Sequence, residues 1–379
     1  MSRATQALVQ INGNSIDLQA LQAELRRSLR GEVRFDRITR ALYATDASVY
    51  QIVPLGVVLP ESEADVAATV DFCVRKGIPL TARGGGTSQA GQAIGAGVIL
   101  DCSKYLNGVL EVNAQERWVR VQPGCVLDDL NFELKRHGLQ FAPDISTSNR
   151  ATIGGMVANN SSGARSVIYG KTIDHVLELK VILADGRPEW LGPLGAGQLE
   201  ARCAQDGLAG ACHRAVRQLA AQHADEIERR FPKILRRVGG YNLDRFVPKW
   251  IDEHKFNLAH LLVGSEGTLG VVVEAKLGLV ELPRAKAVLV IQFADLLEAL
   301  TATPLILEHA PAAVEVIDRY VLESTRLNAE AARLRDFLAG DPGAILIVEL
   351  YGDRPEELPP RLDALERALR SQKHGYHFL

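Results

Sequence analysis

Two polar, glycine-rich segments far apart along the chain place the strongest constraint on its fold. The first, TARGGGTSQAGQA at residues 81–93, sets Arg83, three consecutive glycines and two hydroxyl side chains after an apolar run that predicts a strand. Glycines let backbone N–H groups turn toward an anion, while the arginine adds charge and the hydroxyls add donors. The segment therefore suits a phosphate site, although a tight strand-to-strand turn would also require the glycines.

The first segment matches neither of the common nucleotide-binding signatures. No lysine follows the glycines, as G-x-x-x-x-G-K-[ST] requires, and Gln89 interrupts the G-x-G-x-x-G frame that Gly84 and Gly86 begin. A nucleotide-binding phosphotransferase would also need a lysine or a magnesium-binding carboxylate beside the loop, and the sequence offers neither.

The second segment, residues 142–176, mixes Gly, Ser, Thr and Asn with almost no long apolar side chain. This composition predicts a loop outside the hydrophobic core. A loop of this length is uncommon in a compact domain unless it wraps a ligand. Together, the two segments predict an elongated, polyanionic ligand.

The rest of the sequence predicts an α+β fold. Strands at 57–60 and 78–82 flank a helix at 61–77, and later strands and helices follow in irregular order. A charge-rich helical insertion is expected at about 200–248. After Pro283 the β-α-β order predicts a second domain, with one antiparallel sheet under helices, that includes one helix at about 320–338. The expected domains are residues 1–45, an N-terminal helical appendage, then 46–283 and 284–379.

The composition of the chain excludes several classes of ligand and indicates where in the cell the protein is located. A formal net charge of -3 provides no basic field for nucleic acid or an anionic membrane surface. The five cysteines include no C-x-x-C pair, so neither a zinc site nor an iron–sulfur cluster is predicted. No apolar stretch approaches the roughly 20 residues that span a bilayer, and the first residues lack the apolar core of a signal peptide. We therefore expect a cytoplasmic protein with a small-molecule ligand.

Several motifs in a fixed order resemble the FAD-binding (PCMH-type) domain of the vanillyl-alcohol oxidase superfamily. They are RGGGTS, PD, T-x-GG, NNSSG, YG-x-T-x-DHV, ADG and GSEGTLG, and they span about residues 45–285. Within the superfamily the chain is similar to the FAD-linked D-2-hydroxyacid dehydrogenases: glycolate oxidase subunit, D-lactate dehydrogenase and D-2-hydroxyglutarate dehydrogenase. RALYATDASVYQIVP and RRFPKILRRVGGYNLD resemble large bacterial proteins that fuse such a flavin half to an iron–sulfur half.

The resemblance implies a fold and an activity. Residues 46–283 would form a two-lobed PCMH-type FAD-binding domain, and 284–379 an incomplete antiparallel-sheet cap domain for substrate. The activity would be oxidation of a D-2-hydroxyacid, such as D-lactate or D-2-hydroxyglutarate, to the 2-oxoacid by hydride transfer to flavin N5. The alternative is an FAD-binding fragment or subunit that needs further sequence or a partner for activity. An iron–sulfur domain or subunit would accept the electrons.

The resemblance also assigns residues to FAD. The backbone amides of the first segment would cradle the pyrophosphate, at Arg83, Gly84, Gly85, Gly86, Thr87 and Ser88. The second arm of the site would consist of Pro143, Asp144, Ser148, Thr152, Gly154 and Gly155. The remaining contacts would be Asn160 and Gly163 near the ribityl and flavin rings, Val176 at the adenine, and Glu266 with Gly267 closing the pocket. Ser162 departs from the family pattern, because it replaces a glycine.

FAD is expected to bind without a covalent link. Some superfamily members attach it through a histidine at the fifth position of the glycine loop or a cysteine near the second segment. Thr87 occupies that fifth position here, and no cysteine lies between Asp144 and Ala158.

Catalytic residues are not apparent in the sequence. In the resembled family the base is a histidine in an H-x-x-x-x-x-x-H type motif, and none of the nine histidines fits it. A K/R-x-x-x-G-Y-D/N-L segment ahead of the GSEG motif assigns Arg237, Tyr241 and Asn242 to the substrate. The alternative for the basic residues of this stretch is a solvated helix face.

Overall fold

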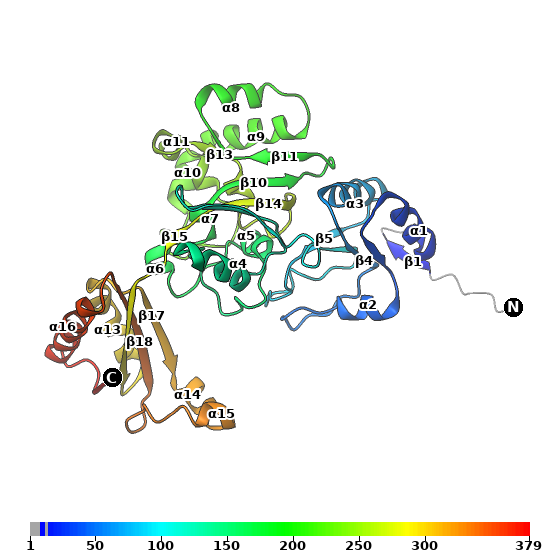
Figure 1. Cartoon of the computed structure of the whole chain (residues 1–379). Coiled ribbons are helices and arrows are strands. Elements are labelled where there is room, and N and C mark those ends of the chain that lie inside the picture. Colours follow the sequence, from blue (N-terminus) through cyan, green and yellow to red (C-terminus); the bar gives the residue numbers. More distant parts are fainter. Residues whose placement is uncertain (1–7, 12–13) are drawn as a thin grey trace. The chain divides into compact units, whose positions relative to one another are not determined.

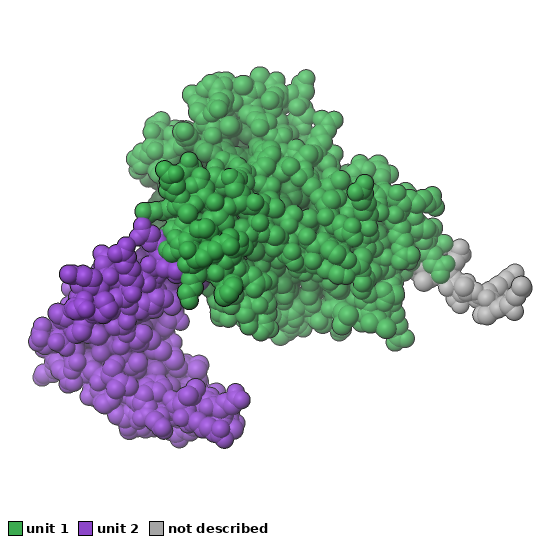
Figure 2. Space-filling model, in the orientation of Figure 1, with its two compact units in different colours: residues 1–141, 145–161, 171–280 green, residues 142–144, 162–170, 281–379 purple. Residues whose placement is uncertain are grey.

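The computed structural model describes residues 8–11 and 14–379 and divides into two compact units. The first consists of Met1–Phe141, Ile145–Ser161 and Lys171–Val280, and the second of Ala142–Asp144, Ser162–Gly170 and Glu281–Leu379 (Figure 2). Two short pieces of the long polar segment therefore belong to the C-terminal unit. The main division, after Val280, lies close to the domain boundary expected after residue 283.

A four-stranded sheet carries the glycine loop at the end of one of its strands. The order is β3-β4-β6-β5, in which β4, β6 and β5 are parallel and β3 is antiparallel to β4. The strands are β3 (Glu32–Arg34), β4 (Gly56–Leu59), β5 (Leu80–Arg83) and β6 (Val98–Asp101). The two central strands, β4 and β6, are buried along their whole length, as their mostly apolar sequences indicate.

The helix between β4 and β5 has capping residues at both ends. In α3 (Glu63–Lys76), the Ser62 hydroxyl accepts a hydrogen bond from the Asp65 amide at 3.2 Å. Gly77 ends the helix in the left-handed conformation, with φ of 62°. These caps fix the point at which β5, and with it the glycine loop, begins.

The N-terminal segment, which was expected to form a helical appendage, is grouped with the first unit. In α1 (Leu18–Ser28), the buried Leu18, Leu21 and Leu25 share a hydrophobic core with Val58 of β4. Their helical spacing places them on one face, which packs beside α3 (Figure 1). The other elements of this segment are β1 (Leu8–Ile11), β2 (Asn14–Asp17) and α2 (Arg37–Leu42). Residues 1–7 and 12–13 of the expected appendage lie outside the described residues.

A five-stranded antiparallel sheet forms the other part of the first unit, in the order β11-β10-β14-β8-β7. Its strands are β7 (Val109–Asn113), β8 (Trp118–Val121), β10 (Val176–Ile182), β11 (Pro188–Leu191) and β14 (Val271–Gly278). Burial alternates along β14, so one face of the sheet packs on the core and the other is partly exposed.

Helices occupy the region that was expected to be a helical insertion. It contains α8 (Ala196–Cys203), α9 (Leu208–Gln222), α10 (Ala224–Arg230), η2 (Leu243–Phe246) and α11 (Pro248–Glu253) (Figure 1). The other short elements outside the C-terminal sheet are α4 (Leu127–Leu134), η1 (Lys135–His137), β9 (Leu139–Gln140), β12 (Pro193–Leu194), β13 (Phe256–Asn257), α12 (Ala259–Leu262) and β15 (Val280–Glu281).

The long polar segment is not one irregular loop. It contains α5 (Ile153–Asn159), α6 (Ser166–Tyr169) and α7 (Thr172–His175). Ile153, Met156 and Val157 are buried in the core of the first unit, which contradicts the expectation that the segment lies outside any core. The i, i+3, i+4 spacing places the three on one helical face. The paired glycines between them obscured that pattern in the sequence.

The second unit contains the expected antiparallel sheet, in the order β17-β18-β16-β19. Its strands are β16 (Ala285–Phe293), β17 (Ala313–Asp318), β18 (Ala344–Gly352) and β19 (His377–Phe378). The helices α13 (Leu296–Glu308) and α16 (Leu358–Ser371), the latter preceded by η3 (Pro355–Glu357), cover one face and share its core. The α+β class and the antiparallel cap are therefore confirmed.

The single helix expected at about 320–338 is wrong. The structure has two short helices there, α14 (Arg319–Arg326) and α15 (Ala329–Ala332). The break occurs at Asn328, whose side chain accepts hydrogen bonds from the amides of Glu330 and Ala331 and so starts a new helix. Across the described residues, no helix is both long and apolar enough to cross a membrane.

Candidate functional site

The glycine loop after β5 packs directly on the segment that leads into α5. A Cβ atom at Gly84 would lie 2.3 Å from Oγ1 of Thr152, and one at Gly85 would lie 2.2 Å from the backbone oxygen of Arg150. Both distances are too short for any side chain, so the contact requires glycine. The structure thus brings together the two polar segments from which a single elongated ligand was predicted.

The glycine loop leaves a row of backbone donors without a protein acceptor. Among the hydrogen bonds of the described residues, none is donated by the amides of Gly85, Gly86, Thr87 or Ser88. Gly86 has φ of 65°, the left-handed conformation that lets successive N–H groups form a concave anion site. The loop therefore fits a pyrophosphate group through its backbone, as the resemblance implies.

Arg83 supports the loop from within the protein. Its guanidinium donates to the backbone oxygens of Thr45 at 2.9 Å and Ala93 at 3.1 Å, and lies 5.2 Å from the centre of the Tyr43 ring. Arg83, whose charge was expected to attract the phosphate, therefore already has partners within the protein. The sequence analysis did not identify Thr45 as a partner of Arg83.

Gly154 and Gly155, which were also assigned to FAD, allow close packing but offer no unpaired backbone amides. The Gly154 amide donates to the backbone oxygen of Pro123 at 2.8 Å, and a Cβ at Gly154 would lie 2.7 Å from Cβ of Pro123. The Gly155 amide donates to Oγ1 of Thr152, which caps α5, at 3.4 Å. The hydrogen bonds of both amides are thus made within the chain.

The GSEG turn contacts the other end of α5. The Gly264 amide donates to the Val157 oxygen at 2.9 Å, and the Glu266 amide donates to the Ala158 oxygen at 3.0 Å. The Glu266 carboxylate also accepts from the side-chain amide of Asn159 at 3.1 Å. Gly267 follows with φ of 75°. Both ends of α5 are therefore in contact with segments that the sequence assigned to FAD.

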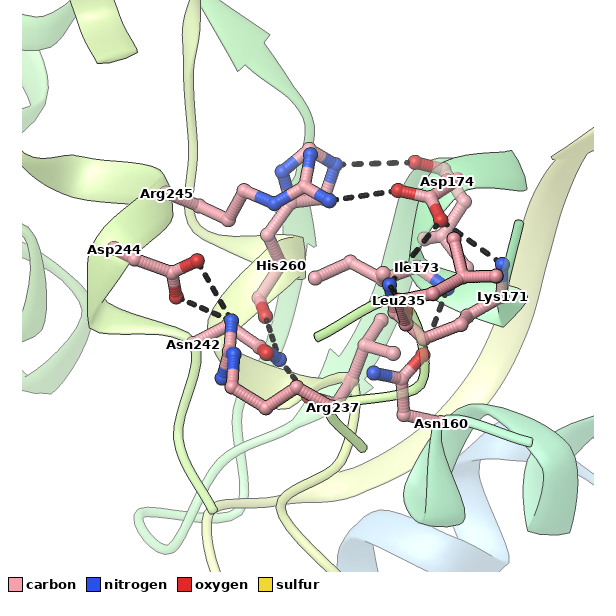
Figure 3. Close-up of polar contacts among 12 residues, drawn as sticks. Asn160, Lys171, Ile173, Asp174, Leu235, Arg237, Asn242, Asp244, Arg245 and His260 are labelled. Atoms are coloured by element: carbon pink, nitrogen blue, oxygen red, sulfur yellow. Dashed lines mark hydrogen bonds and ion pairs between the residues drawn. The ribbon is translucent and has the colours of Figure 1, made fainter. Parts of the chain in front are cut away.

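Asn160, directly after α5, has an unpaired buried donor. Its Oδ1 accepts from the Ile173 amide at 3.0 Å, while Nδ2 is buried without a partner among the described residues (Figure 3). Buried side-chain amides are rarely left without an acceptor. A ligand acceptor beside Asn160 would satisfy this group, which is consistent with its assignment to FAD.

Three assigned residues, Pro143, Asp144 and Gly163, belong to the second unit. A Cβ at Gly163 would lie 1.7 Å from the backbone oxygen of Asp144, so these two positions are in close contact. Arg165 donates to the carboxylates of Asp144 at 3.2 Å and Glu349 of β18 at 2.9 Å. The role of these residues in FAD binding stays a prediction.

Ser148 and Val176 remain in the first unit. The Ser148 oxygen accepts from the Asp128 amide at 3.1 Å. The Val176 amide donates to the Thr172 oxygen, and its oxygen lies 3.4 Å from Nε2 of His260. The N–H and C=O groups of Val176 therefore both have partners within the chain.

The three substrate candidates differ in how accessible their side chains are; Figure 3 shows two of them, Arg237 and Asn242. Nη2 of Arg237 lies 2.6 Å from each carboxylate oxygen of Asp244. Asn242 is buried and donates to the backbone oxygens of His260 at 3.2 Å and Val263 at 2.7 Å. Tyr241 is 45% exposed, and its hydroxyl lies 2.9 Å from Oγ1 of Thr268. Of the three, Tyr241 alone presents a large exposed surface.

The most perturbed histidine of the first unit is His260. Burial, aided by the charge of Arg245, lowers its pKa to about 4, so the ring is neutral at physiological pH. Arg245 itself pairs with Asp174 at 2.7 Å (Figure 3). Within the described part of the chain, no group of three or more His, Cys, Asp or Glu side chains is arranged to hold a metal ion.

Two family matches cover most of the chain outside the N-terminal segment. Residues 54–192 match the family described as FAD binding domain. Residues 282–375 match the C-terminal domain of FAD linked oxidases. Every assigned cofactor residue from Arg83 to Val176 lies within the first match, and FAD is thus the cofactor of this domain.

The chain is similar to curated relatives over nearly its whole length. D-2-hydroxyglutarate dehydrogenase of Pseudomonas putida is 38% identical over 358 residues, which are 93% of this chain and 35% of that protein. The enzyme of the same name from Escherichia coli is 34% identical, over 92% of this chain and 35% of its own length. Glycolate oxidase subunit GlcD of Bacillus subtilis is 29% identical, over 75% of this chain and 50% of its length.

The chain spans about a third of the length of the D-2-hydroxyglutarate dehydrogenases that it matches. A solved structure of alkyldihydroxyacetonephosphate synthase shares the fold, with a TM-score of 0.64 and 18% identity over 97% of this chain and 62% of that one. The glycine loop, the order of the motifs and both family matches agree: the chain contains an FAD binding domain followed by a domain that matches the C-terminal domain of FAD linked oxidases.

Proposed function

We propose that the chain is the flavin-binding part of an FAD-dependent dehydrogenase that oxidises a D-2-hydroxyacid to the 2-oxoacid. The relatives named D-2-hydroxyglutarate dehydrogenase support D-2-hydroxyglutarate as the substrate, and D-lactate dehydrogenases with 27% and 29% identity support D-lactate. Bound FAD supplies the hydride acceptor, at N5 of the flavin. The electrons would pass to an iron–sulfur domain or subunit, a proposal that rests on the resemblance to fused flavin and iron–sulfur proteins.

The observation that carries this proposal is the arrangement around α5. The glycine loop contacts the N-terminal end of this helix, and the GSEG turn contacts its C-terminal end. The loop offers backbone donors for a pyrophosphate, and Asn160 offers a buried donor beyond the helix. An elongated dinucleotide carries acceptors along its length and would supply partners for both groups.

Anaerobic reduction of the flavin tests the activity. We expect the purified full chain to be yellow, and D-2-hydroxyglutarate or D-lactate to bleach its absorbance in the absence of oxygen. The L-enantiomers serve as the control and should leave the absorbance unchanged. FAD that no D-2-hydroxyacid reduces would contradict the activity but not the binding of the cofactor.

A second candidate function is an FAD-binding subunit that is inactive alone. The ion pair between Arg237 and Asp244 favours it, because the cation assigned to the substrate is already paired. The same bleaching experiment distinguishes this function from the active dehydrogenase when it is repeated with an added partner chain. That chain would supply the C-terminal part of the relatives that this chain does not cover. Reduction that appears only with the partner would favour the second function.

We also propose a cytoplasmic location. The five cysteines are free thiols, and the pKa values of Cys73, Cys102 and Cys125 are raised to about 12 by burial. Unpaired thiols are usual for proteins of a reducing compartment. Cell fractionation followed by immunoblotting checks the location.

A further inference from the structure

A segment that no motif assigned to the cofactor, residues 45–48, lies against the glycine loop. The Ala47 amide donates to the Gly86 oxygen at 3.0 Å, and the Thr45 oxygen accepts from Nη2 of Arg83 at 2.9 Å. Thr45 also forms an isolated antiparallel bridge with Gln51, which closes the segment into a turn. This turn therefore contacts the glycine loop at its first residue and again at Gly86.

Asp46 and Arg83 hold the far end of the same loop. Ala93 donates its amide to Oδ2 of Asp46 at 3.4 Å, and its carbonyl accepts from Nη1 of Arg83 at 3.1 Å. The Ala93 N–H is thus bound by the Asp46 carboxylate, and the Ala93 C=O by the Arg83 guanidinium. Because Arg83 starts the loop and Ala93 ends it, the two side chains clamp the loop closed.

Asp46 is suited to this position because it stays ionised. Burial opposes its ionisation, but hydrogen bonds from Ser48 and the Ala93 amide, together with the charge of Arg83, outweigh burial and leave the pKa below its ordinary value. Its Oδ1 accepts from the Ser48 amide at 2.8 Å, which fixes the carboxylate in its turn.

We propose that Asp46 is a positioning residue of the FAD site, which holds the free amides of Gly85 to Ser88 in the geometry that binds the pyrophosphate. Closing a flexible glycine loop costs conformational entropy, and a clamp that is present before the ligand arrives removes that cost from binding. Asp46 acts through Ala93 and Arg83, without touching FAD. The inference rests on the proposed binding of FAD to this loop.

An Asp46→Asn variant of the full chain tests the clamp. The side chain keeps its shape and one acceptor, but it loses the charge and cannot accept from both amides. We expect the dissociation constant for FAD, measured from flavin fluorescence on dilution of the loaded protein, to rise about tenfold. We expect the melting temperature without FAD to change little.

Asp36→Asn is the matched control. Asp36 accepts from the amide and hydroxyl of Thr39 at the start of α2, so it is another turn carboxylate of the same unit. Its replacement should lower the melting temperature and leave FAD affinity unchanged. Arg83→Lys is a second probe in case Asp46→Asn does not fold, because lysine keeps the charge but cannot bridge Thr45 and Ala93; it should also raise the dissociation constant.

The outcomes separate this inference from the proposed function. Wild-type protein that binds no FAD overturns both. If the wild-type protein binds FAD and Asp46→Asn binds it with unchanged affinity, the inference alone is overturned. The same holds for Arg83→Lys if Asp46→Asn does not fold. An equal loss of affinity in Asp36→Asn also overturns it, because the effect then follows stability rather than the clamp.

Discussion

Arg237 and Asp244 form an ion pair in which one guanidinium nitrogen lies 2.6 Å from both carboxylate oxygens. The Arg237 side chain is only 15% exposed and lies over the Phe231 ring. An arginine held in this way connects two parts of the segment ahead of the GSEG turn. Because Arg237 is paired within the protein, its replacement should affect the stability of the fold.

We expect Arg237→Ala to lower stability rather than substrate affinity. Removing one partner leaves a partly buried carboxylate unpaired, at a cost of about 1–3 kcal/mol in the free energy of unfolding. Urea denaturation of Arg237→Ala, Asp244→Asn and the double variant measures the coupling between the two side chains. A raised KM for a D-2-hydroxyacid with unchanged stability would instead support the substrate role that the sequence suggested.

We expect Gly85→Ala to weaken both the fold and FAD binding. The added methyl would lie 2.2 Å from the Arg150 backbone oxygen, so the loop must move away from the segment that leads into α5. Overpacking of this kind costs about 1–3 kcal/mol. Chemical denaturation measures the loss of stability, and flavin fluorescence measures the loss of affinity.

Gly197→Ala provides the control for this substitution. Gly197 lies in α8, where a Cβ would meet nothing within 4 Å. Alanine is the better helix former, so stability should rise by up to about 1 kcal/mol and FAD binding should not change. Equal effects of the two substitutions would argue against a steric requirement for Gly85.

We expect His260 to make the first unit less stable as the pH falls. Its pKa is about 4 in the folded protein against an ordinary 6.5, so between these values the unfolded chain binds the proton first. Stability therefore declines as pH drops below about 6.5, by about 3 kcal/mol near pH 4. The free energy of unfolding of His260→Gln should lack this part of the pH dependence. His137→Gln, at an exposed position, should retain it.

We expect acid precipitation to release the flavin. Thr87 stands where some superfamily members carry the histidine that bonds to FAD, and a threonine hydroxyl forms no such link. Absorbance at 450 nm, a typical flavin band, should appear in the supernatant and not in the washed pellet. A yellow pellet would show a covalent bond at another residue.

Sequence patterns predicted the parts of the fold in which local and tertiary preferences agree. The helix α3 has an N-terminal serine, a C-terminal glycine and an apolar face, and the structure has it within a few residues of the prediction. The strands of the second unit also alternate or run apolar as predicted. The helix α5 was missed because Gly154 and Gly155 lower helix propensity, and only packing against Pro123 and the glycine loop compensates for them.

Side-chain roles were harder to predict than positions. Arg83 and Arg237 occupy the expected segments, but the sequence could not show that each has partners elsewhere in the chain. The partner of Arg83 at Thr45 lies 38 residues away along the chain. Contacts of this kind depend on the tertiary fold, which no local pattern records.

The path of residues 142–170 has a consequence for exchanging parts between related proteins. The chain enters the second unit at Ala142–Asp144, leaves it, and enters again at Ser162–Gly170 before Glu281 begins the rest of that unit. Arg165 and Asp144 form ion-pair contacts that reach Glu349 of β18. A chimaera joined only near residue 281 would therefore combine these two residues with a foreign β18. Grafts that exchange the second unit should therefore carry its three pieces together.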